Sequence, residues 1–387
     1  MSFATAVPHP ADVTDTRLPN GVRIRLEARP HAASAAIVLR LAGGTREETD
    51  AAAGRLHLLE HLLLRRTARR APEALADCIA RLGGEVNAET GREHLALLGR
   101  APAPRVPELA ALLVECLCEP AFDDTDLALE RGAIAAERTF LGQMPPLEAL
   151  LRLAWPAHPL GRPLLPAEAL HADAATLRKL WSTQAVGARL TVTVSGAFDL
   201  AAVQAALAPL GELPSGALPA AQDAPQFVPG RYGDLREDRP ATLLWALPCL
   251  PFEEANRPGW ELAASMLDHR LGARLRENGL AYACAAQPLL FADAGLIAVQ
   301  VQAPAGQVAR CADAVEACID ALAAGGAETP LVQLARRRAA AEARLAIDEP
   351  LRHALALASA AHPSPCDWAL LVPARLPASA AALRLIL

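Results

Sequence analysis

Residues 54–64, Gly-Arg-Leu-His-Leu-Leu-Glu-His-Leu-Leu-Leu, combine a leucine-rich helical pattern with three side chains that can carry chemistry. At about 3.6 residues per turn, His57 and His61 lie on one face of a helix, with Glu60 on the same side. Two imidazoles at this spacing can bind one Zn²⁺, and a neighbouring carboxylate can take a proton from a metal-activated water. The pattern alone also fits ordinary residues at the boundary of a core, so the zinc hypothesis needs a third ligand.

The segment 124–142 offers that third ligand on a second predicted helix. Glu130 and Glu137 are seven residues apart, which is about two turns, and project from the same face. Apolar residues between them, among them Ile134, indicate that this face packs inward. Two acids on an inward face are costly unless they meet a metal or hydrogen-bond donors. One of them is therefore a candidate ligand, and the other a candidate partner for a ligating histidine.

The same order of elements occurs twice along the chain, which favours duplication of one unit. Strands are expected at 22–27, 35–42, 85–90, 94–99, 189–195, 241–248, 280–287 and 294–302. Helices are expected near 52–68, 72–82, 105–118, 124–142, 146–155, 174–184, 255–275, 306–323 and 329–346, and after Asp199. The segment 213–240 is rich in Pro, Gly, Ala and Gln and indicates a linker.

We therefore expect an α+β fold with two homologous domains, each an antiparallel sheet covered by helices on one face. The predicted boundaries are 1–212 for a zinc-binding catalytic domain, 213–240 for the linker and 241–387 for the second domain.

Composition excludes several classes of function. The 387 residues carry 37 basic and 43 acidic side chains, a net charge of −6, with no basic cluster that would bind nucleic acid. No P-loop, GxGxxG or GxSxG sequence occurs, which disfavours nucleotide-cofactor and α/β-hydrolase sites. The sequence shows no signal peptide or membrane span, and its 8 cysteines, without a CxxC pattern, are typical of free thiols. We expect a cytoplasmic protein without nucleic-acid or membrane partners.

Together these features resemble the inverzincin zinc peptidases, the family of pitrilysin, insulin-degrading enzyme and mitochondrial processing peptidase. In that family His-x-x-Glu-His is followed by a distant glutamate, with another acid seven residues before it. Here Glu137 follows His61 by 76 residues and Glu130 by seven, which matches the family spacing. The segments 43–47 and 82–90 on either side of the helix also match.

The resemblance implies a role for each of these side chains. His57, His61 and Glu137 would ligate one Zn²⁺ per chain. Glu60 would be the general base that takes a proton from water and passes it to the leaving amine. Glu130 would support the site without touching the metal. The implied activity is that of a zinc metalloendopeptidase.

The segment after the zinc helix resembles the family's substrate-binding strand. Asn87 and Ala88 match an Asn-Ala pair on a sheet edge, where a peptide adds as a further strand. Such backbone hydrogen bonds can hold any extended sequence. Glu89 departs from the pattern, because relatives usually carry an aromatic or small residue there, and its charge favours basic or polar substrate residues.

The second half lacks a metal site, because His269 has no histidine partner at a spacing of four. The sequence that follows is similar to the family's Arg-Glu-x-x-Gly-Leu-x-Tyr, in which the arginine and tyrosine bind the substrate backbone and stabilise the oxyanion. Arg276 and Tyr282 match these positions. The copy is one residue short after Arg276, so Arg270 and Arg274 are alternatives, and Tyr282 also fits an ordinary strand residue.

Relatives close a chamber from four α+β units, and this chain carries two. The resemblance therefore implies a second chain, either another copy in a homodimer or a zinc-less paralogue in a heterodimer. Residues 378–387 show no stretch matching the strand at 189–195, so the second domain is expected to be trimmed.

The favoured function is cleavage of short or unfolded peptides in the chamber. Maturation of a peptide precursor, by leader removal or by processing of a quinone-cofactor precursor, is the favoured role. The alternative is a non-catalytic structural or regulatory subunit of a peptidase-like complex.

Overall fold

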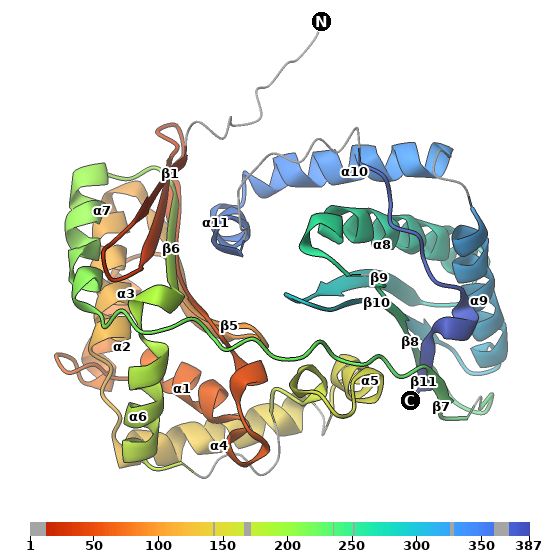
Figure 1. Ribbon diagram of the computed structural model, residues 1–387, viewed down its shortest axis with the longest axis horizontal. Helices are drawn as coiled ribbons and strands as arrows, with labels where there is room; N and C mark the ends of the chain where they lie inside the picture. The colour runs from red at the N-terminus through yellow and green to blue at the C-terminus, as the bar shows by residue number, and fades with distance from the viewer. Residues whose placement is uncertain are drawn as a thin grey trace, which may run out of the picture. The chain divides into compact units, whose positions relative to one another are not determined.

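The computed structural model describes residues 13–141, 144–165, 172–234, 236–250, 252–325, 329–359 and 371–387. The chain divides into two compact units, each with its own sheet (Figure 1). Unit 1 draws on the segments 1–141, 164–221 and 344–365, and unit 2 on 142–163, 222–343 and 366–387. Each unit is therefore assembled from separate stretches of the chain, whereas the predicted domains are continuous.

Unit 1 is built on a six-stranded sheet with the strand order β1-β2-β6-β3-β5-β4. Its pairings are antiparallel except for that of β2 with β6, which is parallel. Strand β4 lies at one edge, and no described strand pairs with its outer side. The strands are β1 (Val13–Arg17), β2 (Arg23–Ala28), β3 (Ser34–Ala42), β4 (Glu85–Thr90), β5 (His94–Pro102) and β6 (Leu190–Gly196).

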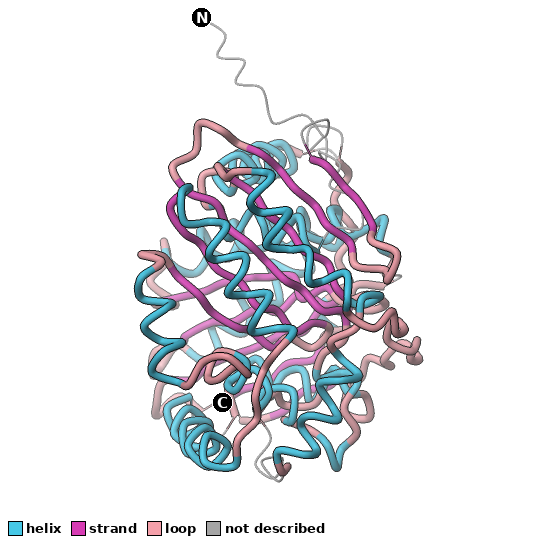
Figure 2. The backbone as a smooth tube through the Cα atoms, turned by 90° about the vertical axis from the view of Figure 1, so that its left-hand side faces the viewer, coloured by secondary structure: helices cyan, strands magenta, loops and turns pink. Residues whose placement is uncertain are grey.

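Helices cover one face of this sheet, and Figure 2 shows them in front of the strands. Alternate residues of β3, among them Ile37 and Leu39, point into the core and meet apolar side chains of the helices. The helices that contribute to this core are α1 (Arg55–Leu63), α2 (Pro72–Arg81), α3 (Val106–Cys118), α4 (Asp124–Leu141), α6 (Ala174–Gln184) and α7 (Leu200–Leu207).

The opposite face of the first sheet carries a further helix, α11 (Pro350–Ser359). Ala36 and Val38 of β3 pack with Ala354 and Ala358 of this helix. The expectation of helices on one face only is corrected by this second layer. Because both faces are covered, residues 35–39 form an uninterrupted apolar run, Ala-Ala-Ile-Val-Leu, in place of an alternating one.

Charged side chains tie α11 to the sheet. The carboxylate of Glu27, in β2, lies 2.9 Å from Nε2 of His353 and accepts a hydrogen bond from Oγ of Ser195. Arg25 donates a hydrogen bond to the carbonyl of Leu357, and both Arg25 and Glu27 are buried. Burial raises the pKa of Glu27, but the hydrogen bonds from His353 and Ser195 outweigh it, so the pKa is lowered. The carboxylate is therefore held ionised beneath the helix.

Unit 2 repeats the arrangement around a five-stranded sheet with the order β7-β11-β8-β10-β9. One face packs on α8 (Arg257–Leu271) and α9 (Val308–Ala324), with Trp245 and Val299 in the core between them. Helix α10 (Pro330–Ala346) packs against α8. The strands are β7 (Gly230–Tyr232), β8 (Ala241–Pro248), β9 (Ala283–Leu290), β10 (Gly295–Ala303) and β11 (Leu383–Ile386).

The other face of the second sheet is covered by α5 (Pro146–Ala154). Leu150 and Leu151 of this helix pack with Leu244 and Leu296 of the strands. In sequence, α5 lies between elements of unit 1, and α11 follows elements of unit 2. Each sheet is therefore covered on one face by a helix from a segment outside its predicted domain.

The C-terminus differs from its expectation. Leu383–Ile386 forms β11, which pairs antiparallel with β8 and parallel with β7. Strand β6 has the same place in unit 1, because it lies between β2 and β3. The prediction that the second half lacks this strand is wrong. Its signal is weak because the strand has 4 residues where β6 has 7.

The α+β class and most predicted elements are confirmed. Asp199 is the N-cap of α7, since its carboxylate accepts the backbone N–H of Ala202 at 2.8 Å. Helix α1 is shorter than predicted and ends at Leu63, and β1, β7 and α11 have no predicted counterpart. None of the helices in the described ranges is long and apolar enough to cross a bilayer.

Glu27→Gln tests the ionic contact beneath α11. The variant should lose about 2 kcal/mol of unfolding free energy at neutral pH, because it removes a buried carboxylate that contacts His353 and accepts a hydrogen bond from Ser195. Since the folded pKa of Glu27 is lowered, its contribution is present above the unfolded pKa and is lost as the pH falls through the folded pKa. The difference from wild type should therefore shrink in acid. Chemical denaturation at neutral and acid pH measures it.

The exposed Glu108→Gln is the matched control for this measurement, because it changes the charge by the same amount outside the core. Equal stability of Glu27→Gln and wild type at neutral pH would show that the carboxylate of Glu27 does not stabilise the contact with α11.

Candidate metal centre

Helix α1 is positioned by its leucines and by a carboxylate that lies outside the helix. Leu56 and Leu59 are almost fully buried, so the polar residues project from the other side. Glu48 accepts hydrogen bonds from the backbone N–H groups of Gly54 and Leu56, at 2.8 and 2.7 Å. These N–H groups have no partner within the helix. The start of α1 is therefore fixed by a residue that the sequence analysis did not single out.

Three donor atoms converge beside α1. Nε2 of His57 and Nε2 of His61 are 2.9 Å apart, and Oε2 of Glu137 lies 3.4 Å from the first and 3.6 Å from the second. In a tetrahedral zinc site with bonds of about 2.0 Å, neighbouring ligand atoms are about 3.3 Å apart. The triad therefore fits one zinc ion. In the part of the chain that the structure describes, no other three His, Cys, Asp or Glu side chains converge in this way.

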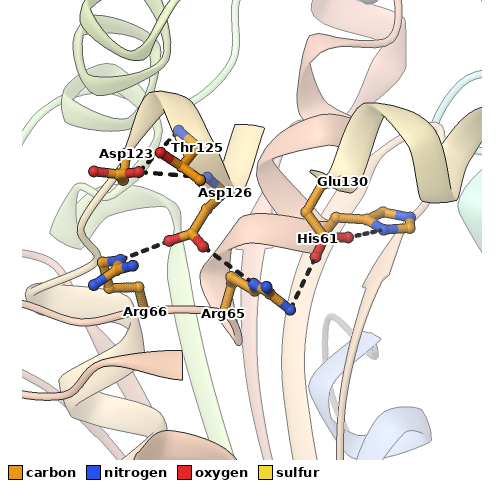
Figure 3. A network of polar contacts seen from close by, with 7 residues as sticks. All are labelled: His61, Arg65, Arg66, Asp123, Thr125, Asp126 and Glu130. Carbon is orange, nitrogen blue, oxygen red and sulfur yellow. Dashed lines mark hydrogen bonds and ion pairs between the residues drawn. The ribbon is translucent and has the colours of Figure 1, made fainter. Parts of the chain in front are cut away.

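Glu130 lies behind His61 and does not join the triad (Figure 3). Its Oε2 is 3.0 Å from Nδ1 of His61, where the carboxylate can accept the Nδ1–H. That hydrogen bond leaves Nε2 of His61 unprotonated and able to bind a metal. Nη1 of Arg65 is 3.6 Å from the other carboxylate oxygen of Glu130. The geometry supports Glu137 as the ligand and Glu130 as the partner of His61.

A buried acid at the start of α4 connects this helix to the residues after α1. Asp126 pairs with Nε of Arg66 at 2.6 Å and with Nε of Arg65 at 3.3 Å (Figure 3). Arg65 therefore bridges Asp126 and Glu130, which lie one turn apart on α4. The sequence analysis missed Asp126. Its position four residues before Glu130, on the same face of the helix, could have indicated that it also supports the site.

The environment of His57 suits it to a metal ligand. Burial, and secondarily the adjacent His61, lowers the pKa of His57 to about 4. At neutral pH its imidazole is therefore uncharged and has a lone pair for a cation. The two rings stack with their centroids 4.8 Å apart, which keeps both nitrogens on one side of the helix. Two imidazoles and one carboxylate are a donor set that suits zinc.

Glu60 lies beside the triad, where α1 meets β4. Burial raises the pKa of its carboxyl, and hydrogen bonds from Thr90 offset this only in part. Oγ1 of Thr90 also donates to the carbonyl of Leu56 at 3.4 Å, so this threonine connects β4 to α1. A carboxyl with a raised pKa suits general acid–base work near neutral pH.

Strand β4 provides the predicted sheet edge. Asn87 is exposed and Ala88 is buried against the core, so they lie on opposite faces. Because no described strand pairs with the outer side of β4, its backbone groups can bind an extended peptide. Glu89 lies on the same face as Asn87, and its carboxylate is 3.1 Å from Nε2 of His94. The binding of substrate at Asn87 and Ala88 stays a prediction.

Arg276 and Tyr282 lie in unit 2, whereas the triad belongs to unit 1. Arg276 ends a π-helical turn, Gly272–Arg276, and its guanidinium lies over Gly272, where an added Cβ would be 2.4 Å from Nη2. Tyr282 is 92% exposed just before β9. Their roles toward substrate stay predictions. His269 is exposed at the end of α8, in agreement with a boundary residue.

Comparison with known proteins supports the same interpretation. An uncharacterized zinc protease of Streptomyces coelicolor is 28% identical over 334 residues, which cover 80% of this chain and 71% of that protein. A probable mitochondrial-processing peptidase subunit beta of Arabidopsis thaliana is 30% identical over 187 residues, 47% of this chain and 35% of that protein. The crystal structure of a peptidase M16 inactive domain from Pseudomonas fluorescens matches with a TM-score of 0.84 at 15% identity, over 97% of both chains.

Two family profiles cover most of the sequence. The profile of insulinase, peptidase family M16, matches residues 23–168 and includes the whole triad, and that of the peptidase M16 inactive domain matches residues 171–338. Together with the fold and the His-His-Glu geometry, these matches show that the chain belongs to peptidase family M16, the insulinase family.

Proposed function

We propose that this chain is a zinc metalloendopeptidase that cleaves short or unfolded peptides. The proposal is carried by one observation: three donor atoms lie at the separations of zinc ligands, with the carboxyl of Glu60 beside them. When bound, zinc polarises the scissile carbonyl and makes a water molecule more acidic. Membership of a family whose relatives are named zinc proteases supports the same activity.

The chain's own groups move the proton in the proposed reaction. Glu60 accepts a proton from the attacking water and later donates it to the leaving nitrogen. Its raised pKa brings proton uptake and release closer to neutral pH. Glu130 orients His61 through Nδ1, and Nη1 of Arg65 lies 3.6 Å from the other carboxylate oxygen of Glu130. These contacts hold the side chain of His61 in position, so that it need not rearrange during the reaction.

The substrate peptide is proposed to bind as an extra strand at the outer edge of β4. Asn87 and Ala88 lie on this strand, three and two residues before Thr90, which hydrogen-bonds Glu60. Binding through the backbone selects extended segments, which short or unfolded peptides offer. Arg276 and Tyr282, from this chain or from a partner, are proposed to bind the substrate backbone and the oxyanion.

We further propose that the complete enzyme contains a second chain, as a homodimer or as a heterodimer with a zinc-less paralogue. One relative in sequence is named as a subunit of a processing peptidase, which supports an assembly of chains. The proposed setting is the cytoplasm, with cleavage in a chamber between the two chains. Maturation of a peptide precursor, either leader removal or quinone-cofactor precursor processing, is the favoured role.

A non-catalytic structural or regulatory subunit is the second candidate function. It is favoured by the segment after Arg276, which is one residue shorter than the family pattern. The complete triad and Glu60 oppose it, because a scaffold subunit has no need of either.

The purified protein should contain about one zinc ion per chain, and His61→Ala should abolish the zinc because it removes one of three protein ligands. Metal analysis after dialysis against metal-free buffer measures both. His269→Ala, which changes an exposed histidine of unit 2, should retain the metal. Metal-free wild-type protein that also fails to take up added zinc would refute the metal site.

Glu60→Gln should reduce peptide cleavage between about a hundredfold and ten-thousandfold, because it removes the general base. Zinc content should stay unchanged, since Glu60 is not a ligand. Cleavage of internally quenched peptides is measured for the chain alone and after mixing with a zinc-less paralogue. Undiminished cleavage by Glu60→Gln would sink the proposed mechanism. Zinc-loaded wild type that is inactive in both assays would support the non-catalytic alternative.

Glu130→Gln should weaken zinc binding about 10- to 100-fold, the usual effect of losing the acceptor behind a ligating histidine. The amide keeps the size of the side chain but lacks the charge that orients the Nδ1–H of His61. Competition with a chelating dye measures the zinc dissociation constant. Glu342→Gln, an exposed acid outside the site, is the control. An unchanged constant in Glu130→Gln would remove Glu130 from the site.

A further inference from the structure

Helix α4 presents an exposed apolar face beside the metal ligand Glu137. From Ala128 to Phe140, every exposed residue of the helix is alanine, leucine, glycine, threonine or phenylalanine. Leu129 is 56% exposed and Phe140 is 89% exposed. A helix at the surface of a soluble protein usually presents charged side chains to water. An apolar face of this kind indicates contact with a ligand or a partner.

Helical geometry places part of this face next to the triad. Ala133 lies about 40° round the helix from Glu137 and Phe140 about 60°, both on the same side. The buried apolar residues of α4, Leu127 and Ile134, lie on the opposite side of Glu137. Ala133 and Phe140 therefore border the solvent-facing side of the metal site.

Four residues with spacings of four, three and four form a continuous surface, which we call the apolar shelf: Leu129, Ala133, Ala136 and Phe140. The two alanines place small side chains between the larger leucine and phenylalanine. A Cβ added to Gly132, beside the shelf, would meet no atom of the described residues within 4 Å, so this part of the helix surface is open.

The path of a bound peptide leads to this shelf. Helix α1 packs against β4 and against α4, and the triad lies where α1 and α4 meet. A peptide held at the outer edge of β4, with its scissile bond at the triad, continues along α4. We propose that the apolar shelf binds an apolar side chain of the substrate, next to the scissile bond and on the side of that bond away from β4. This inference rests on the proposed peptidase function.

The size of the shelf favours a substrate side chain over a second copy of the chain. A stable protein–protein interface uses roughly 20–30 residues on each side. The shelf offers four side chains on one helix face, and it borders a metal ligand. Both features suit a specificity site, which makes few contacts close to the reacting bond.

Phe140→Ser and Ala133→Gln test the shelf, because the first removes its largest side chain and the second places a large polar side chain in its middle. Ala128→Gln is the matched control, since Ala128 is an exposed alanine on the far side of the same helix. The probes are internally quenched peptides of one extended sequence. Mass spectrometry first locates the cleaved bond. Each residue flanking that bond is then replaced in turn by Leu, Phe, Ser, Glu or Lys.

Wild type should cleave the Leu and Phe peptides most efficiently at one flanking position. Phe140→Ser should lower kcat/KM for those peptides about tenfold, the usual value of small changes in an apolar pocket, and leave the Ser peptide unchanged. Ala128→Gln should retain the wild-type preference. Zinc-loaded Glu60→Gln protein, titrated with the same peptides by fluorescence polarisation, should show the preference in binding without turnover.

An identical preference in wild type, Phe140→Ser and Ala133→Gln would overturn this inference, while zinc- and Glu60-dependent cleavage would leave the peptidase function standing. If zinc-loaded protein neither binds nor cleaves any of the peptides, both the shelf inference and the proposed peptidase function fail. If Phe140→Ser instead converts a dimer to a monomer on size-exclusion chromatography with the preference intact, the shelf is an interface between copies and the inference fails.

Discussion

Carboxylates hold the chain at both ends of α1, and the chemistry of unit 1 depends on that constraint. Glu48 binds the backbone N–H groups at the start of the helix, and Asp126 binds the arginines just after its end. Buried leucines fix the rotation of the helix about its axis. With position and rotation both set, the two histidines project toward α4 at separations that suit a metal. A small shift of α1 would change both histidine–Glu137 separations together.

The two sheets satisfy a second constraint, because each has two apolar faces. In unit 1 the face opposite the main core packs on α11, and in unit 2 it packs on α5. Each of these helices comes from a segment that lies far in sequence from most of the unit it covers. Expressing residues 1–212 and 241–387 as separate fragments would therefore leave each sheet without the helix on its second face and expose apolar surface to water. The halves depend on each other for burial, although each has its own core.

Local patterns predicted most of the helices and strands well, because hydrophobic periodicity and N-capping act over a few residues. The elements that they missed are short or lie on unexpected faces. Helix α11 was not predicted to cover the first sheet. Its apolar residues indicate that one face is buried, but they do not indicate which sheet that face packs on. Strand β11 is missed because four residues carry little periodicity. The uninterrupted apolar run at 35–39 is the signal that could have indicated a second covering layer.

The sequence by itself determined the chemistry: the spacing of His57 and His61 on one helix and the pair Glu130 and Glu137 on another follow from helical geometry alone. Helical geometry left open which glutamate would meet the metal, because both project from one face of α4, and only the family spacing pointed to Glu137. The tertiary structure shows how the groups meet, because the packing of α1 on α4 places Glu137 at Nε2 and Glu130 at Nδ1 of His61, which supports Glu137 as the ligand. The supporting groups Glu48 and Asp126 were likewise decided in three dimensions. Their partners are backbone amides and arginines, which carry no motif, and ion pairs between distant segments form only once the chain has folded.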